Sequence, residues 1–164
     1  MSGHKDLPVL RDPSTGYSCH QIPPLPENQD RIRAFKEYLI GRFTRYGYEG
    51  FSLEIDAYFD PFSIFFYVEN DGGEILATAK MTWKSDHTRI PLEMGVRADG
   101  SRFSLEGNIP TFDVNSFAFT RLDALPLLYA GLGSTGSQRD TRRAFCLLDE
   151  ENLRIKELYA MAGF

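Results

Sequence analysis

Long hydrophobic runs and clusters of basic charge are missing from this 164-residue sequence. No apolar stretch approaches the roughly 20 residues that a membrane-spanning helix needs, so no membrane span is predicted. The 18 Lys and Arg residues are outnumbered by 23 Asp and Glu, and the net charge of −5 argues against nucleic acid as a partner. The N-terminus lacks the apolar core of a signal peptide, and we therefore expect a cytoplasmic protein.

Cysteine and histidine are also scarce. Cys19 and Cys146 lie far apart, which indicates neither a disulfide framework nor a zinc site. The histidines at positions 4, 20 and 87 are scattered and no two have ligand spacing, so we expect no bound metal. The sequence shows no Ser-His-Asp or Cys-His constellation, and we therefore expect no covalent intermediate on the protein.

Apolar residues, by contrast, are plentiful. Hydrophobic residues make up 42% of the chain and aromatic residues 13%, a composition typical of one globular domain with a real core. Residues 1–28 are rich in Pro, Gly and polar residues, and they predict an N-terminal arm that is extended or mobile. The domain itself would then cover residues 29–164, because no repeat or linker divides it.

The spacing of apolar residues predicts the order of the elements. A helix is predicted over 30–46, from the stripe formed by Ile32, Phe35, Leu39 and Phe43. An acidic, aromatic bend follows, and then come strands and hairpin turns at 64–68, 70–73, 75–83, 99–100 and 114–119. The last predicted elements are a helix over 121–137, a strand over 144–148 and a short final helix. This order indicates an α/β fold with a mixed sheet.

The final helix carries two polar side chains suited to ligand binding or catalysis. Asn152 and Tyr159 are seven residues apart, close to two helical turns, so both lie on one face. An Asn amide can bind a ligand and a phenol can donate a proton. The alternative is an ordinary amphipathic helix with Ile155, Leu158 and Ala162 on its core side.

The strand at 144–148, followed by N-x2-I-x2-L-Y-x3-G-F over 152–164, resembles the coenzyme A-binding end of the GNAT superfamily of N-acyltransferases. The resemblance covers residues 30–164. It implies a single GNAT-like α/β domain with a mixed, mostly antiparallel sheet and flanking helices, in which parallel strands at 113–119 and 144–148 splay apart to admit a pantetheine chain. Asn152 would contact the coenzyme. Superfamily members continue with two further strands, so the domain is expected to lack them or to receive them from another subunit, and an unpaired edge would favour a homodimer.

The segment Gly131-Leu-Gly133-Ser-Thr-Gly136 fits the pattern G-x-G-x-x-G. No strand precedes it directly, which disfavours a nicotinamide or flavin site. Two interpretations remain. In the first, Gly131 and Gly133 open a helix whose N–H groups cradle a pyrophosphate, as the superfamily loop implies. Alternatively, 122–137 is one helix with small residues for close packing, and the phosphates meet N–H groups near three residues: Phe119, Thr120 and Arg121.

The acidic bend contains Asp56 and Asp60, and from composition alone it is a polar loop anchored by aromatic residues. Followed by a strand, a hairpin and Thr78-Ala-Lys80-Met, it resembles the subgroup that contains acyl-homoserine-lactone synthases and long-chain N-acyl amino acid synthases. The resemblance implies that Asp56, Asp60 and Lys80 contact the substrate. The acidic spacing is one residue longer than in that subgroup, and Ala77 and Lys80 replace Gly and Arg. Lys80 can supply the charge but not a bidentate fork.

The resemblance implies transfer of an acyl group from a coenzyme A thioester, or from an acyl carrier protein, to a primary amine such as an amino acid. Asp113 is the first candidate for the base that deprotonates the amine, and Asp56 is the second. Tyr159 would protonate the leaving thiolate. Two other interpretations stay open: Asp113 is a strand-start residue bound by a turn N–H, or the protein keeps the fold without catalysis and binds a thioester cofactor or a protein partner.

Overall fold

The computed structural model describes residues 9–48, 52–85, 87–105, 108–147, 153–161 and 163. Its strands are β1 (Leu10–Arg11), β2 (Ser18–Ile22), β3 (Ser63–Glu69), β4 (Ile75–Trp83), β5 (Thr111–Phe119) and β6 (Arg143–Cys146). Its helices are α1 (Gln29–Arg45), α2 (Leu53–Phe59), α3 (Pro91–Met94), α4 (Leu125–Gln138) and α5 (Leu153–Met161), with short 3-10 turns at Pro26–Asn28, Asp60–Phe62 and Leu122–Ala124. Of the described helices, none is long and apolar enough to cross a membrane.

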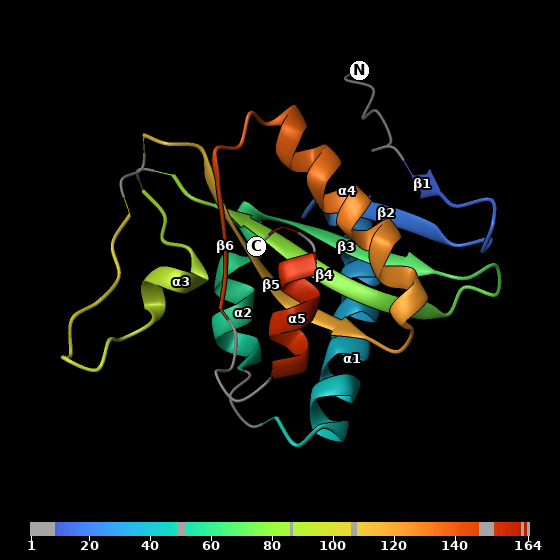
Figure 1. The fold of residues 1–164 in the computed structure, drawn as a ribbon, viewed down its shortest axis with the longest axis horizontal. Coiled ribbons are helices and arrows are strands. Elements are labelled where there is room, and N and C mark those ends of the chain that lie inside the picture. The colour runs from blue at the N-terminus through green and yellow to red at the C-terminus, as the bar shows by residue number, and fades with distance from the viewer. Residues whose placement is uncertain are drawn as a thin grey trace.

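The strands form one sheet in the order β1-β2-β3-β4-β5-β6. All neighbours are antiparallel except β5 and β6, which pair in parallel from Thr111↔Arg143 to Val114↔Cys146. Helices α4 and α5 cover one face, and α1 and α2 cover the other (Figure 1). The predicted α/β domain, with its mixed, mostly antiparallel sheet, parallel pair and flanking helices, is therefore confirmed.

The central strands are buried on both faces because helices cover both. Residues 63–68 of β3 are all buried, as are residues 76–82 of β4. One core lies between the sheet and α4 and α5, and it includes Phe66, Met81 and Leu128. The second core lies under α1, where Phe35 meets the edge of the Phe65 ring at a centroid distance of 5.1 Å. Burial on both faces explains why β3 lacks polar alternation, whereas β4 buries Thr78, Lys80 and Thr82 at alternate positions.

The N-terminal segment belongs to the sheet, which corrects the expectation of an arm for its described residues. Strand β2 pairs with β3 from Ser18↔Glu69 to Ile22↔Phe65, and β1 pairs with β2. Cys19 and Ile22 have no exposed surface. The densest prolines of this segment, Pro23, Pro24 and Pro26, come only after β2 ends. Composition averaged over 28 residues therefore concealed a five-residue strand.

The predicted first helix and central hairpin are confirmed. Helix α1 buries Ile32, Phe35 and Leu39. The turn between β3 and β4 is closed by Asn70, whose Oδ1 accepts hydrogen bonds from the N–H groups of Gly72 and Glu74, both at 3.0 Å. The acidic bend, however, is a helix: Ser52 caps α2 by accepting a hydrogen bond from Ile55 N–H at 3.3 Å. Carboxylates in the first turn also favour a helix start, because its N–H groups carry partial positive charge.

The structure agrees with the second interpretation of the glycine segment, a single packed helix. Gly131 and Gly133 lie in the middle of α4, where backbone N–H groups bond to carbonyls one turn earlier. A Cβ on Gly131 would lie 2.8 Å from Cys19 Sγ, and one on Gly136 would lie 3.3 Å from the Phe112 ring. These glycines let α4 lie close to the sheet. Gly131 and Gly133 are therefore not a phosphate-binding loop, which corrects their assignment to the cofactor.

Candidate functional site

Strand β5 contains a β-bulge at its middle. Lys80 pairs with Asn115 and Thr78 pairs with Ala118, so Ser116 and Phe117 together oppose the single residue Ala79. Ser116 has a φ of 52°, in the left-handed region that residues other than glycine rarely adopt. The extra residue of a bulge interrupts the alternation of side chains between the two faces of the sheet.

The bulge places two consecutive polar side chains on the face of α2. Asn115 contacts Thr82 and Asp113 on that face, and Ser116 contacts Asp56 of α2. The next residue, Phe117, returns to the opposite face, where its ring lies 5.0 Å from that of Tyr159. Without the extra residue, Ser116 would point to the apolar core under α4 and α5.

A cavity of about 830 Å³ opens beside this bulge. Its walls come from the end of α1, from α2, from residues 114–119 of β5 and from α5. The wall contributed by α1 and α2 is largely apolar and aromatic and includes Phe43, Tyr46, Ile55 and Phe59. The cavity therefore joins both faces of the sheet at one edge of β5.

The edge of β5 along this cavity is open within the described residues. Strand β6 pairs with β5 only as far as Val114, which leaves residues 115–119 without a partner on that side. Thr120 N–H donates to Leu76 O of β4 at 2.8 Å. Because successive residues of a strand direct their N–H and C=O groups to opposite sides, the backbone of Phe119 faces the open edge. An extended ligand can pair with such an edge as an added strand would.

Tyr159 lies near the end of α5, which is the predicted final helix, and its side chain reaches the cavity from there. Its side chain is 3% exposed and it lines the cavity beside Phe117. Burial raises the pKa of the Tyr159 phenol well above its usual value of 10.0, so the phenol keeps its proton at neutral pH. Of the three residues predicted on the core side of α5, Leu158 is buried, and the side chains of Ile155 and Ala162 lie outside the described part.

Asp113 lies directly behind the cavity wall. It has no exposed surface, while the neighbouring Pro91 and Asn115 line the cavity. Its carboxylate accepts hydrogen bonds from Asn115 Nδ2 at 3.1 Å and from Leu92 N–H at 3.2 Å. Burial nevertheless raises the pKa of this carboxyl from 3.8 to about 7. A group with that pKa exchanges a proton near neutral pH, as a general base must.

Asp56, Asp60 and Lys80 do come together, but as members of one ion-pair network. Lys80, with no exposed surface, contacts Asp56 Oδ1 and lies 3.2 Å from Asp60 Oδ1. Lys36 of α1 contacts Asp60 and lies 3.6 Å from Asp56 Oδ2. Two carboxylates thus face two ammonium groups. Lys80 cannot reach a ligand in the cavity, which corrects its assignment to the substrate, and Asp56 lines the cavity with only 8% exposure.

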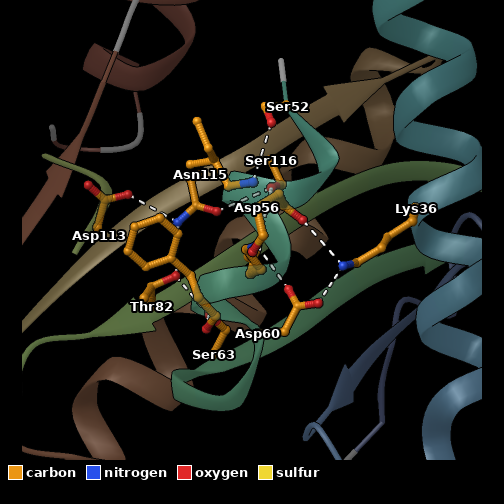
Figure 2. A network of polar contacts seen from close by, with 12 residues as sticks. Lys36, Ser52, Asp56, Asp60, Ser63, Thr82, Asp113, Asn115 and Ser116 are labelled. Atoms are coloured by element: carbon orange, nitrogen blue, oxygen red, sulfur yellow. Dashed lines mark hydrogen bonds and ion pairs between the residues drawn. The ribbon is translucent and has the colours of Figure 1, made fainter. Parts of the chain in front are cut away.

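The bulge connects this network to Asp113, and Figure 2 shows the chain of contacts between Lys36 and Asp113. Ser116 Oγ donates to Asp56 Oδ1 at 2.9 Å and lies 3.2 Å from Asn115 Oδ1. Asn115 Nδ2 also donates to Thr82 Oγ1 at 3.0 Å. Both N–H bonds of the amide are therefore used, and the amide orientation is set by its partners. Ser116 and Asn115 hold the two predicted base candidates in one rigid arrangement.

Ser116 variants should separate the hydroxyl contact from the backbone strain. Ser116→Ala loses a hydrogen bond to a charged group and keeps the positive φ, so we expect its free energy of unfolding to fall by about 1–3 kcal/mol. Ser116→Gly also loses the hydroxyl but should recover about 1–2 kcal/mol, because glycine adopts positive φ without steric cost. Denaturant unfolding measures both.

Asp140 is the matched control, since it is the other non-glycine described residue with positive φ, at 49°, and it is exposed. Asp140→Gly relieves strain and removes only an exposed ion pair with Arg142 at 3.2 Å, which should contribute about 0–1 kcal/mol. Equal stability of Ser116→Ala and Ser116→Gly would show that strain at the bulge is negligible.

The remaining predicted coenzyme residues divide into two groups. Phe119, Thr120 and Arg121 line the cavity where β5 ends and the turn into α4 begins. The Arg121 guanidinium is exposed and lies 2.8 Å from Asp123. Asn152 lies outside the described residues. No three His, Cys, Asp or Glu side chains gather as metal ligands in the part of the chain that is described.

Sequence reasoning missed Lys36 and Asn115. Lys36 lies off the apolar stripe of α1 and resembles any solvated lysine, and only the packing of α1 against α2 brings it to Asp60. Asn115 lies two residues after Asp113, and its role depends on the bulge. A polar residue in an otherwise apolar strand was the one available signal.

In comparisons with known proteins, no family model matches the chain and no curated protein matches its sequence. Solved structures do match it. An aminoglycoside acetyltransferase, meta-AAC0020 from an uncultured soil metagenomic sample, shares 9% identity at a TM-score of 0.58, over 92% of this chain and 90% of that one. AAC(6')-Iy with a coenzyme A bisubstrate analogue shares 13% identity at a TM-score of 0.57, over 90% of each chain. Glucosamine-6-phosphate N-acetyltransferase from Arabidopsis thaliana shares 15% identity at a TM-score of 0.52, over 90% of each chain.

The chain has the GNAT acetyltransferase fold. At these identities the likeness shows the fold alone, because one fold can carry many functions. The finer resemblance to the lactone and N-acyl amino acid synthases loses its structural basis, since Asp56, Asp60 and Lys80 pair with one another. The splayed edge of β5, which the GNAT resemblance implied, is present within the described residues.

Proposed function

We propose that this protein is an N-acyltransferase that moves an acyl group from an acyl-coenzyme A thioester to the primary amine of a small molecule. The observation that carries the proposal is the open edge of β5 at residues 115–119, which lies beside a cavity that Tyr159 also lines. The names of the similar structures add support, because they include acetyltransferases for aminoglycosides and for glucosamine 6-phosphate, both of which are amines.

The donor would bind as an added strand. The amide groups of a pantetheine chain match the exposed backbone of β5 around Phe119. The pyrophosphate would then meet the N–H groups that begin the turn into α4, near Thr120 and Arg121. An acyl carrier protein presents the same pantetheine arm and is the alternative donor. A long acyl chain on the donor and a homodimer through the edge of β6 both stay predictions.

The chemistry is one direct transfer. The amine loses a proton, its nitrogen attacks the thioester carbonyl, and the carbon–sulfur bond breaks. Asp113 would take the amine proton through a bridging water, because Asn115 and Pro91 separate the carboxylate from the cavity. An N–H of the open edge would stabilise the charge on the carbonyl oxygen. The Tyr159 phenol, protonated at neutral pH, would donate its proton to the leaving thiolate.

The rate should depend on the ionisation of Asp113. Its pKa is raised from 3.8 to about 7, so the carboxyl is mostly protonated, and inactive as a base, below that pH. We therefore expect kcat/KM to rise about tenfold per pH unit up to about pH 7 and then to level off. Asp113→Asn should lower the rate about 10²–10⁴-fold and abolish this inflection. An unchanged pH profile in the variant would assign the base to another group.

The test of the proposed function is thermal stability in the presence of coenzyme A, acetyl-CoA and longer acyl-CoAs, followed by thiol release with a panel of amines. A ligand at 100 times its Kd stabilises the native state by about 2.7 kcal/mol. Stabilisation that grows with acyl length would favour a long-chain donor. Binding without thiol release from any amine would favour the non-catalytic alternative. The absence of any thermal shift and of any turnover would contradict both.

A further inference from the structure

The cavity has an unusual balance of charge for an enzyme whose structural neighbours are named for aminoglycosides. Its charged lining residues are one aspartate and three arginines: Asp56, Arg42, Arg121 and Arg154. Asp56 is already paired with Lys80 and Lys36 inside the protein. Arg121 is paired with Asp123. Among the described residues, Arg42 and Arg154 have no carboxylate within salt-bridge distance, so the uncompensated charge on the cavity wall is positive.

Arg42 is also held in place. It lies one helical turn before Tyr46 at the end of α1, and its guanidinium carbon lies 4.7 Å from the centroid of the Tyr46 ring. Its Nη2 donates a hydrogen bond to the Tyr46 hydroxyl. Its Nε is buried and has no hydrogen-bond partner within the described structure. A guanidinium that rests on an aromatic ring loses less entropy when it binds a ligand, and its planar fork suits a carboxylate or phosphate.

Arg42 lies on the acceptor's side of the site. Helices α1 and α2 cover the face of the sheet that carries Asp113, Asn115 and Ser116, whereas Tyr159 and the start of α4 lie toward the other face, where the coenzyme's thiolate and pyrophosphate would be. Around Arg42 the wall is apolar and aromatic, with Phe43 and Ile55. A molecule between this wall and β5 meets one fixed cation and apolar surface.

We propose that Arg42 binds an oxyanion of the acceptor, so that the substrate is an amine that also carries a carboxylate or phosphate group and an apolar portion. This inference rests on the proposed function and names the acceptor class for the same site. A polycationic amine is a poor acceptor, because Asp56 and Asp60 are already paired with Lys36 and Lys80 and the positive charge of the cavity arginines repels it.

Matched acceptors test the inference with acetyl-CoA or the best acyl-CoA as donor. L-phenylalanine and L-phenylalaninamide differ in the carboxylate, glucosamine 6-phosphate and glucosamine differ in the phosphate, and kanamycin is the polycation. We expect the anionic member of at least one pair to have a kcat/KM at least tenfold higher than its neutral partner. Arg42→Gln should remove that preference by raising the acceptor KM, and Arg42→Lys should keep part of it. Arg45→Gln, in the same exposed turn but away from the cavity, should change neither.

Three outcomes would overturn the inference: a preference for kanamycin, equal rates for the members of both pairs, or an effect of Arg42→Gln on the KM of acyl-CoA alone. The last would assign Arg42 to a donor phosphate, and the use of acyl-pantetheine as donor, which lacks every phosphate of the coenzyme, would then abolish the effect of the variant. Melting temperatures of the variants separate misfolding from lost recognition. If acyl-CoA neither shifts the melting temperature of the unaltered protein nor turns over, the proposed function fails together with this inference; turnover without an anion preference overturns the inference alone.

Discussion

Replacing Tyr159 with Phe is expected to lower the turnover of acyl-CoA about 10²–10⁴-fold, with little loss of coenzyme binding. The phenol is 3% exposed at the cavity, and burial raises its pKa well above 10.0, so it carries the proton that the leaving thiolate needs. Phenylalanine keeps the packing against Phe117 and removes only the hydroxyl. Thiol release under saturating substrate measures the rate, and titration of the melting temperature measures binding.

Tyr129 offers the matched control on the neighbouring helix. Its ring also stacks on Phe117, at 6.2 Å, and its hydroxyl donates to Leu158 O at 3.4 Å, but its side chain does not line the cavity. Tyr129→Phe should therefore leave the rate within a few fold of the unaltered protein. If Tyr159→Phe and Tyr129→Phe behave alike, the phenol of Tyr159 has no part in the transfer.

Replacing Lys80 with Met is expected to cost about 3–5 kcal/mol of stability, because it leaves two buried carboxylates facing a single ammonium group. Lys80 has no exposed surface, and it joins β4 to Asp56 in the middle of α2 and to Asp60 at the C-terminal cap of that helix. Denaturant unfolding gives the free energy. Arg11→Met is the surface control: the Arg11–Asp71 pair is 3.0 Å long with both side chains mostly exposed, and its loss should cost about 0–1 kcal/mol.

A double variant distinguishes lost charge balance from lost packing. Lys80→Met with Asp56→Leu removes one charge of each sign and leaves Lys36 paired with Asp60. Because replacing both partners of a buried pair by apolar residues is often nearly neutral, we expect most of the stability to return. A cost for Lys80→Met below about 1 kcal/mol would show that the network does not hold α2 against the sheet.

Local sequence patterns predicted several elements with close boundaries. Helix α1 was predicted over 30–46 and spans Gln29–Arg45, and β4 has its predicted bounds of Ile75–Trp83. Apolar spacing and turn residues act within a few positions of one another, so they can be read without the rest of the chain. The same reasoning placed residues 1–28 outside the domain, because strand β2 is short and owes its burial to β3.

The candidate site was predictable where one helix or strand carries it. The C-terminal pattern identified Tyr159, which the fold brings to the cavity, and the resemblance to the superfamily pointed to Asp113. Its raised pKa was not predictable, because burial by Pro91, Leu92 and β6 depends on segments that are far from it in the sequence. The glycine pattern of α4 was open to two interpretations, and the contact of Gly131 with Cys19, more than 100 residues away, decided between them.

The sequence by itself thus determined helices α1, α4 and α5 and the central hairpin, and its resemblance to the superfamily led to the parallel pair and to Tyr159. The tertiary structure alone decided that β5 bulges at Ser116, that Asp56 and Asp60 are neutralised by Lys36 and Lys80, and that Arg42 has no carboxylate partner among the described residues. Register and ion pairing depend on which distant segments meet. Those choices are made by packing of the whole domain, which no local pattern contains.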